Sequence, residues 1–309
     1  VLGAGPAGIS AAAALASFGH KVSLFDSGEA PGGQARQTIP AERLPNGILT
    51  REVQDVLASS GVAEQRQCAL GSSYTLDDVL AEGFDAVLIA LGLSRSVPLP
   101  GSCRPASGVE GALEFLTRIK NGGTVTGQVL VLGGGNTAID AALSAKRAGA
   151  SDVFIVYRRS FAEMPAWPEE RDAAIRAGVH FLVLTAPLAY VLDEKGNLTG
   201  LKVARTRLGE PDASGRRRPE NIPGSEHVLP ASLVVEAIGQ QIDPELAAAL
   251  PGVRVTSRGL IWTRDGTLET SRRGVFAAGD IVNGGTTVVQ AVAEGARVAR
   301  EIDEFLRCT

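Results

Sequence analysis

One pattern occurs twice in the sequence: a short apolar strand, a glycine-rich turn, a helix and a second strand. The copies run from Val1 to Asp26 and from Val131 to Arg159. Their turns share one spacing, with Gly3, Gly5 and Gly8 in the first copy and Gly133, Gly135 and Ala138 in the second. In such a turn the first glycine bends the chain and the second admits a pyrophosphate, while the third position allows close helix–strand packing. A single copy also occurs as a simple turn, but the repeat predicts an α/β chain with two dinucleotide-binding folds.

The two copies differ where their second strand ends. In the first copy this second strand, Lys21 to Phe25, is followed by Asp26. In the second copy it is Val153 to Val156, followed by Tyr157 and two arginines, Arg158 and Arg159. A carboxylate there accepts hydrogen bonds from an unphosphorylated ribose, as in FAD or NAD, and arginines suit the 2′-phosphate of NADP. Solvated arginines at a strand end are the alternative. The pair predicts two different dinucleotides, with NADPH in the second fold.

Composition narrows the class of protein. With 309 residues, 44% of them hydrophobic and 21% charged, the chain is long enough for two domains with full cores. The net charge of −4 gives no reason to expect nucleic acid or an anionic membrane surface. Three scattered cysteines suit a reducing cytoplasm, and three unclustered histidines with no C-x-x-C predict no metal site. Because the chain starts inside a strand, we expect natural sequence upstream of Val1 and no signal peptide.

Each fold has an exit strand, and these strands set the domain boundaries. Phe84 to Ala90 ends at Leu91 and Gly92 before a proline-rich crossover, and Leu233 to Ile238 ends at Gly239. A further buried strand, Gly274 to Asp280, brings Asp280 to its carboxyl end, where doubly wound sheets bind ligands; a helix N-cap is the alternative role. The second domain is therefore predicted to be inserted in the first, with segments 1–100, 107–240 and 243–309.

Three other stretches bear on binding. A glycine-rich loop, Gly28 to Gln34, and the segment Gln37 to Pro45 are expected to wrap an extended cofactor; Arg43 either reaches its phosphate or isoalloxazine, or is solvated. Thr286 and Thr287 begin a predicted helix that runs to Leu306, and its N-terminus would face the pyrimidine edge of a flavin. The basic run Arg216 to Arg218 reads most simply as a solvated hairpin tip, with a partner-docking patch as the minority interpretation.

In these motifs the chain resembles the FAD/NADPH oxidoreductase module of the glutamate synthase small-subunit family, which also occurs in dihydropyrimidine dehydrogenase and NADPH–ferredoxin oxidoreductases. The motifs are GAGPAG from Gly3, PGG from Pro31, IPAERLP from Ile39, GGGNTAID from Gly133, YRRSFAEMP from Tyr157, the GEPDASGRRRP hairpin, EAIG from Glu236, and VFAAGDIVNGGTTVVQAVAEG from Val275. The family usually carries an N-terminal cysteine-rich iron–sulfur domain, which is not in this sequence. Leu91 also replaces a common threonine.

The resemblance implies a pyridine nucleotide-disulfide oxidoreductase-like fold, with two doubly wound, three-layer domains and the NADPH domain inserted in the FAD domain. The FAD residues it implies are Gly3, Gly5, Pro6, Ala7, Gly8, Asp26, Gly33, Gln34, Arg43, Gly92, Gly279, Asp280, Thr286 and Thr287. The NADPH residues are Gly133, Gly135, Asn136, Thr137, Ala138, Arg158, Arg159 and Gly239.

The resemblance also implies a reaction. Hydride passes directly from NADPH to FAD, so no side-chain catalyst is expected, and electrons then leave to an iron–sulfur domain or partner subunit. The alternatives are a stand-alone NADPH-dependent flavin reductase that acts on a diffusible acceptor, and a non-catalytic dinucleotide-binding assembly module. Without a cysteine pair, the chain itself is expected to reduce no disulfide and to hold no iron–sulfur cluster.

Overall fold

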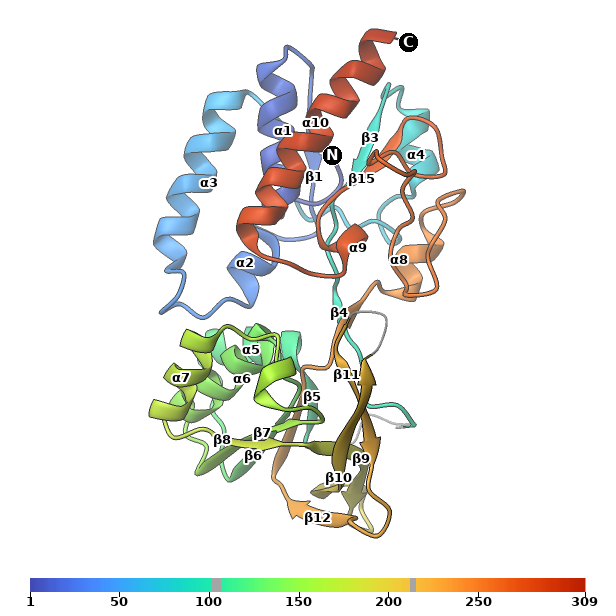
Figure 1. Ribbon diagram of the computed structural model, residues 1–309. Helices are drawn as coiled ribbons and strands as arrows, with labels where there is room; N and C mark the ends of the chain where they lie inside the picture. Colours follow the sequence, from blue (N-terminus) through green and yellow to red (C-terminus); the bar gives the residue numbers. More distant parts are fainter. Residues whose placement is uncertain (102–106, 212–214, 309) are drawn as a thin grey trace. The chain divides into compact units, whose positions relative to one another are not determined.

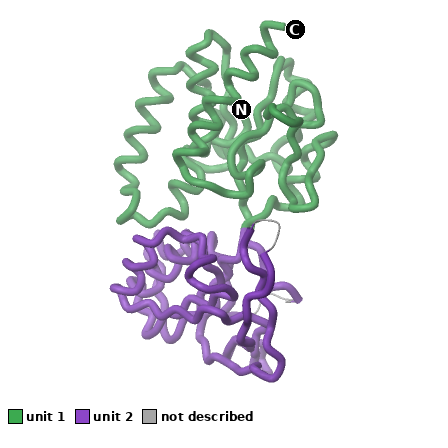
Figure 2. Tube along the Cα trace, in the orientation of Figure 1, with its two compact units in different colours: residues 1–95, 240–309 green, residues 96–239 purple. Residues whose placement is uncertain are grey.

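The chain forms two compact units, coloured separately in Figure 2. The computed structural model describes residues 1–101, 107–211 and 215–308, so the predicted crossover around Cys103 and part of the basic hairpin lie outside the described residues. Unit 1 comprises Val1–Arg95 and Gln240–Thr309, and unit 2 comprises Ser96–Gly239. From the sequence we predict that the chain passes from one domain to the other at 100–107 and returns at 240–243.

Unit 1 is built on parallel strands. β1 (Ser23–Phe25) pairs with β2 (Ala63–Gln65), and β3 (Val87–Ile89) pairs with β15 (Val275–Ala277). Leu2 joins the two pairs, because it forms parallel bridges to both Phe25 and Ile89. The resulting order is β2, β1, Leu2, β3, β15, so the first strand of the fold is reduced to a bridge next to the glycine turn.

Helices cover one face of this sheet, with shorter elements on the other (Figure 1). α1 packs between α10 and α3, and the apolar side chains of α1 and α10 meet Leu88 and Phe276 of the sheet. The helices of unit 1 are α1 (Pro6–Ser17), α2 (Gly33–Gln37), α3 (Asn46–Ser60), α4 (Leu76–Ala81), α8 (Pro244–Ala248), α9 (Asp280–Asn283) and α10 (Val288–Cys308).

Two helix starts differ from the sequence expectation. α2 lies where we expect only a loop, because the Gly32 amide donates to the Ala4 carbonyl over 2.7 Å and this contact fixes the segment against the first glycine turn. α10 begins at Val288 and not at Thr286. Thr287 is its N-cap, with the hydroxyl accepting from the Gln290 amide over 3.2 Å.

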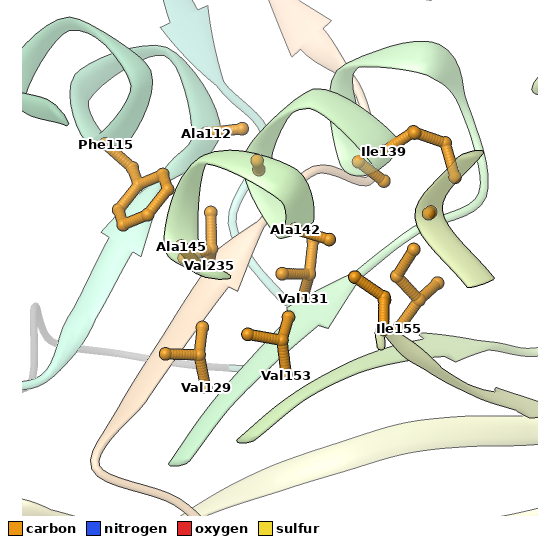
Figure 3. Close-up of a cluster of buried hydrophobic side chains, with 14 of the residues drawn as sticks. Ala112, Phe115, Val129, Val131, Ile139, Ala142, Ala145, Val153, Ile155 and Val235 are labelled. Atoms are coloured by element: carbon orange, nitrogen blue, oxygen red, sulfur yellow. The ribbon is translucent and has the colours of Figure 1, made fainter. Parts of the chain in front are cut away.

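Unit 2 has a five-stranded parallel sheet in the order β5-β13-β6-β7-β8. Its strands are β5 (Val109–Gly111), β6 (Gln128–Leu132), β7 (Asp152–Tyr157), β8 (His180–Val183) and β13 (Leu233–Glu236). Its helices are α5 (Ala112–Lys120), α6 (Asn136–Arg147) and α7 (Pro168–Arg176), with a short 3-10 turn, η1 (Phe161–Glu163). Figure 3 shows the core under α6, where Ile139, Ala142 and Ala145 pack on Val131, Val153 and Ile155.

The other face of this sheet is covered by an antiparallel meander instead of helices. Leu201 and Val203 of the meander are fully buried in one cluster with Leu130, Leu132 and Val234 of the sheet. The meander strands are β9 (Thr185–Leu192), β10 (Leu198–Pro211), β11 (Arg217–Asn221) and β12 (His227–Pro230). Unit 2 therefore has three layers, as we expect, with strands forming the third.

The connections between the units are two short strands that pair with each other. β4 (Arg95–Ser96) leads into unit 2 and β14 (Gln240–Gln241) leads back, and the two form a two-stranded sheet. The Val97 amide continues this pairing by donating to the Gly239 carbonyl over 2.9 Å. Both crossings therefore lie side by side.

Candidate dinucleotide-binding sites

The first glycine turn lies at the N-terminus of α1 and leaves open space there. Gly3 has a φ of +104°, and a Cβ at this position would lie 2.5 Å from the Ala90 carbonyl oxygen, so only glycine fits against the exit strand. At Gly5, in contrast, a Cβ would meet no atom within 4 Å. The backbone at Gly5 therefore borders open space, with the free amides of the helix N-terminus next to it.

The second turn repeats this geometry at the N-terminus of α6. Gly133 has a φ of +134°, and its Cβ would lie 2.3 Å from the carbonyl oxygen of Ala237, which follows exit strand β13. Gly135 again has no atom within 4 Å of such a Cβ. The sequence repeat is thus also a structural repeat, and each unit has one place suited to a pyrophosphate.

Asp26 follows β1 and already binds backbone. Its carboxylate accepts from the Ala4 amide over 2.6 Å and from the Gly28 amide over 2.7 Å, one bond to each oxygen. Asp26 is half-buried, and a carboxylate offers about four acceptor positions, so it retains capacity for ribose hydroxyls. The residue is thus fixed next to the glycine turn in a form suited to an adenosine ribose.

Asp280, the second carboxylate predicted to bind FAD, follows β15. It is the first residue of α9 and not an N-cap, and its carboxylate accepts from the Thr286 amide over 3.2 Å. Burial raises the pKa of Asp280, and the charge of Glu294 adds to the rise, whereas the Thr286 amide opposes it. A half-buried carboxylate with a raised pKa gains from any ligand that donates hydrogen bonds to it.

Sequence reasoning does not find Glu294, although it orders this loop. Its carboxylate accepts from the Gly279 amide over 2.9 Å and from the Asn283 side-chain amide over 3.0 Å. Glu294 is the seventh residue of α10, and in the sequence it is simply a polar residue among small ones.

The raised pKa of Asp280 leads to a prediction for the cofactor-free protein. The folded-state pKa lies above the usual value of 3.8, so the stabilising contribution of this group is present below that pH and is lost as the pH rises through the folded-state value. We therefore expect Asp280→Asn to raise the melting temperature of apoprotein at pH 7 by on the order of 2 °C. The difference should shrink toward pH 4 in calorimetric scans.

Asp303 provides a control of opposite sign for this experiment. A hydrogen bond from His20, 2.9 Å long, holds the pKa of Asp303 below its usual range, so Asp303→Asn should lower the melting temperature at pH 7. An Asp280→Asn apoprotein less stable than wild type at pH 7 would contradict the burial argument.

The remaining predicted FAD residues line the same end of unit 1. Gly33 lies against the first turn, with a built Cβ 2.9 Å from the Gly5 Cα, and the Gln34 side-chain amide donates to the Leu93 carbonyl just after Gly92. Pro6 and Ala7 open α1, and Gly279 approaches Ala7 closely. Arg43 is exposed in the segment between α2 and α3, where its amide donates to the Pro40 carbonyl over 3.0 Å.

The two arginines after β7 have different environments. Arg158 is exposed, and its carbonyl accepts from the Thr206 hydroxyl over 2.8 Å. Arg159 is only 7% exposed, and its Nε donates to the Arg217 carbonyl over 2.8 Å. The sequence predicts equal roles for both, but the structure gives Arg158 the accessible guanidinium and Arg159 a contact to β11.

Several side chains pack against the glycine turn of unit 2. The Tyr157 ring lies under Gly134, where a Cβ would come within 2.7 Å of it, and its hydroxyl donates to the Glu163 carbonyl over 2.8 Å. Asn136 opens α6 and accepts from the Trp167 amide over 3.2 Å, with Thr137 next to it and Ala138 fully buried. Gly239 follows β13 at the same edge, with a φ of +149°.

Among the described residues, no group of three or more His, Cys, Asp or Glu side chains is placed to hold a metal ion. A search of the same residues also finds no helix with the length and apolar character needed to cross a membrane.

Comparison with known proteins gives concordant results. Residues 1–295 match the family model described as pyridine nucleotide-disulphide oxidoreductase. The small chain of glutamate synthase [NADPH] from Escherichia coli is 35% identical over 99% of this chain and 68% of its own length. Subunit beta of the NADP(+)-dependent formate dehydrogenase of Moorella thermoacetica is 44% identical over 99% of this chain, but over only 43% of its own length. The chain thus spans less than half of that relative.

Solved structures show the same fold. Mycobacterium tuberculosis FprA in complex with NADPH matches 99% of this chain and 84% of its own with a TM-score of 0.80 at 18% identity. Thioredoxin reductase of Lactococcus lactis matches the whole chain and 98% of its own with a TM-score of 0.71 at 22% identity. The predicted fold, oxidoreductase class and cofactor pair of FAD and NADPH are confirmed at the level of the family. The chain belongs to the pyridine nucleotide-disulphide oxidoreductases, in the group that includes the small chains of glutamate synthase.

Proposed function

We propose that this chain passes a hydride from NADPH to FAD and then electrons, one at a time, to an iron–sulfur protein, domain or partner subunit. The main support for this proposal is a difference between the two glycine turns, which otherwise have the same geometry. The open space at Gly5 has Asp26 beside it, and the open space at Gly135 is followed by Arg158 after the next strand. One turn suits an unphosphorylated ribose and the other a 2′-phosphate.

The names of the relatives support an electron exit to a partner. The Moorella relative is a beta subunit, and so is the NADPH-Fe(3+) oxidoreductase protein of Geobacter sulfurreducens, which is 37% identical over 99% of this chain and 49% of its own length. Each belongs to an assembly of more than one subunit by its name. An iron–sulfur acceptor fits this arrangement, because such a centre takes single electrons from a two-electron carrier.

The residues of this chain act by binding and orientation. FAD, when bound, supplies the ability to accept two electrons as hydride and to release them singly. Asp26 would hold the adenosine ribose, while Asp280 would receive hydrogen bonds from the middle of the cofactor and Thr286 and Thr287 would lie at its pyrimidine edge. Arg158 would pair with the 2′-phosphate of NADPH. Direct transfer between cofactors depends on alignment, so no side chain acts as acid or base.

The acceptor is tested by following NADPH oxidation in the purified holoprotein. We expect NADPH to bleach the flavin absorbance rapidly, turnover to be slow with the protein alone, and turnover to become fast with ferricyanide or a viologen dye. The variant with Cys68, Cys103 and Cys308 all changed to serine should keep that activity, since Cys68 and Cys308 are isolated thiols and the chain has no C-x-x-C pair.

Each alternative has its own outcome in this assay. Absence of flavin bleaching would favour a non-catalytic assembly module. Fast turnover with a quinone and none with one-electron dyes would favour a stand-alone flavin reductase. A large fall in turnover for the cysteine-free protein, with FAD still bound, would show that a thiol carries electrons and would overturn the proposed exit.

A further inference from the structure

Unit 1 contains a cavity of about 590 Å³, formed by α2, α3, β2 and the loop that precedes α2. Pockets that bind small molecules commonly have volumes of about 300–1,000 Å³. In the described part of the chain, none of the residues predicted to bind FAD lines this cavity. Its lining residues are Ala30, Pro31, Arg36, Thr50, Val53, Gln54, Leu57, Ala58, Gly61, Val62, Glu64 and Arg66.

The apolar part of the lining belongs to the core of unit 1. Val53 and Leu57 lie one helical turn apart on α3, and both are buried in one cluster with Ile9 and Leu24. Because the side chains of a close-packed core keep their positions, this part of the cavity has a defined shape. It offers a preformed surface for an apolar group.

Arg36 supplies a positive charge at the cavity. Its side chain is half-buried, its Nε donates to the Pro31 carbonyl over 2.6 Å, and its Nη1 donates to the Thr50 hydroxyl over 3.0 Å. Both acceptors are neutral, and no carboxylate of the described residues pairs with Arg36. Two of the five N–H donors of its guanidinium are used, so the others can bind an anion.

The other charged residues of the lining neutralise each other. Arg66 and Glu64 form an ion pair of 2.8 Å, and Arg66 also donates to the Glu29 carbonyl over 3.4 Å. Two arginines and one glutamate give the lining a net charge of +1, and the unbalanced charge is that of Arg36. A partly buried cation of this kind gains from a bound anion that replaces its lost hydration.

We propose that this cavity binds a small monocarboxylate with an apolar body, with the carboxylate on Arg36 and the apolar body against Val53 and Leu57. A guanidinium matches a carboxylate in charge and in planar geometry. A single excess positive charge favours a monoanion. The inference goes beyond the proposed function, because this site requires neither NADPH nor an electron acceptor and its test measures binding alone.

The test compares octanoate with its neutral analogue octanamide on the FAD-loaded protein, by isothermal titration. We expect octanoate to bind about 10-fold more tightly or better, since a hydrogen bond to a charged group contributes about 1.5–3 kcal/mol. Arg36→Met should remove this preference, and Arg36→Lys should keep part of it, because the charge remains without the planar donor pair. Failure of wild type to bind octanoate, or equal binding of both compounds, would overturn the proposal.

A second variant leaves Arg36 and its contact to Pro31 intact. Ala58 is an exposed residue of α3 that lines the cavity, so Ala58→Phe should fill the space and weaken octanoate more than about 10-fold. Ser59→Phe adds the same ring one residue further along α3, outside the lining, and should leave binding within about twofold of wild type. Equal losses in both variants, or release of FAD by octanoate, would show that the cavity is not a separate carboxylate site.

Discussion

Gly5→Ala is expected to give a folded protein that has lost most of its affinity for FAD. A Cβ at Gly5 meets no protein atom within 4 Å, so the apoprotein should keep its stability to within about 1 kcal/mol, the usual scale of a helix N-cap change. The same Cβ would project into the space that a pyrophosphate needs. Crowding of this kind costs about 1–3 kcal/mol, which corresponds to about 5- to 150-fold weaker FAD binding.

Gly8→Ala is the companion variant. We expect it to destabilise the fold itself, whereas Gly5→Ala should leave the fold intact. Its Cβ would lie 1.9 Å from the Gly3 carbonyl oxygen, so the backbone of the turn has to move before any cofactor binds. The loss of stability should reach or exceed about 3 kcal/mol. FAD titration and thermal unfolding of both apoproteins give the comparison. If Gly5→Ala retains full FAD affinity, the pyrophosphate does not bind at this turn.

Arg158→Ala should lower kcat/KM for NADPH by one to two orders of magnitude and leave NADH use nearly unchanged. A charge-assisted bidentate contact contributes about 1.5–3 kcal/mol, and only NADPH has the phosphate to make it. The backbone at residue 158 should keep its position in this variant, because Thr206 binds the carbonyl of Arg158 and not its side chain. Steady-state kinetics with both nucleotides provides the measurement. Equal losses for NADPH and NADH would show that Arg158 has a structural role.

The sequence predicts the position of both binding folds well, because the glycine spacing is a local steric requirement. Gly3 and Gly133 each lie against the carbonyl that follows an exit strand, and no larger residue fits there. The strands and long helices therefore appear within a few residues of their expected positions. The two exit strands, β3 and β13, also occupy the predicted places next to the turns.

Contacts between distant segments could not be predicted in this way. Arg159 is buried by a strand 58 residues further along the chain, and nothing near it in the sequence separates it from Arg158. Glu294 binds Gly279 from the next helix, although its local pattern is that of a helix surface. α2 depends on a backbone contact to Ala4 and not on its own short, glycine-led sequence.

Because the connecting strands β4 and β14 pair with each other, unit 2 is suited to replacement as a whole domain. Its two ends leave unit 1 side by side, and Arg95 and Asp243 form an ion pair of 3.0 Å at that point. Insertions are tolerated where the ends of the inserted domain lie close together, since the host fold then needs only a turn to close the gap. If the proposed function holds, we expect that the electron donor can be changed by replacing one contiguous stretch of gene, while unit 1 keeps every residue.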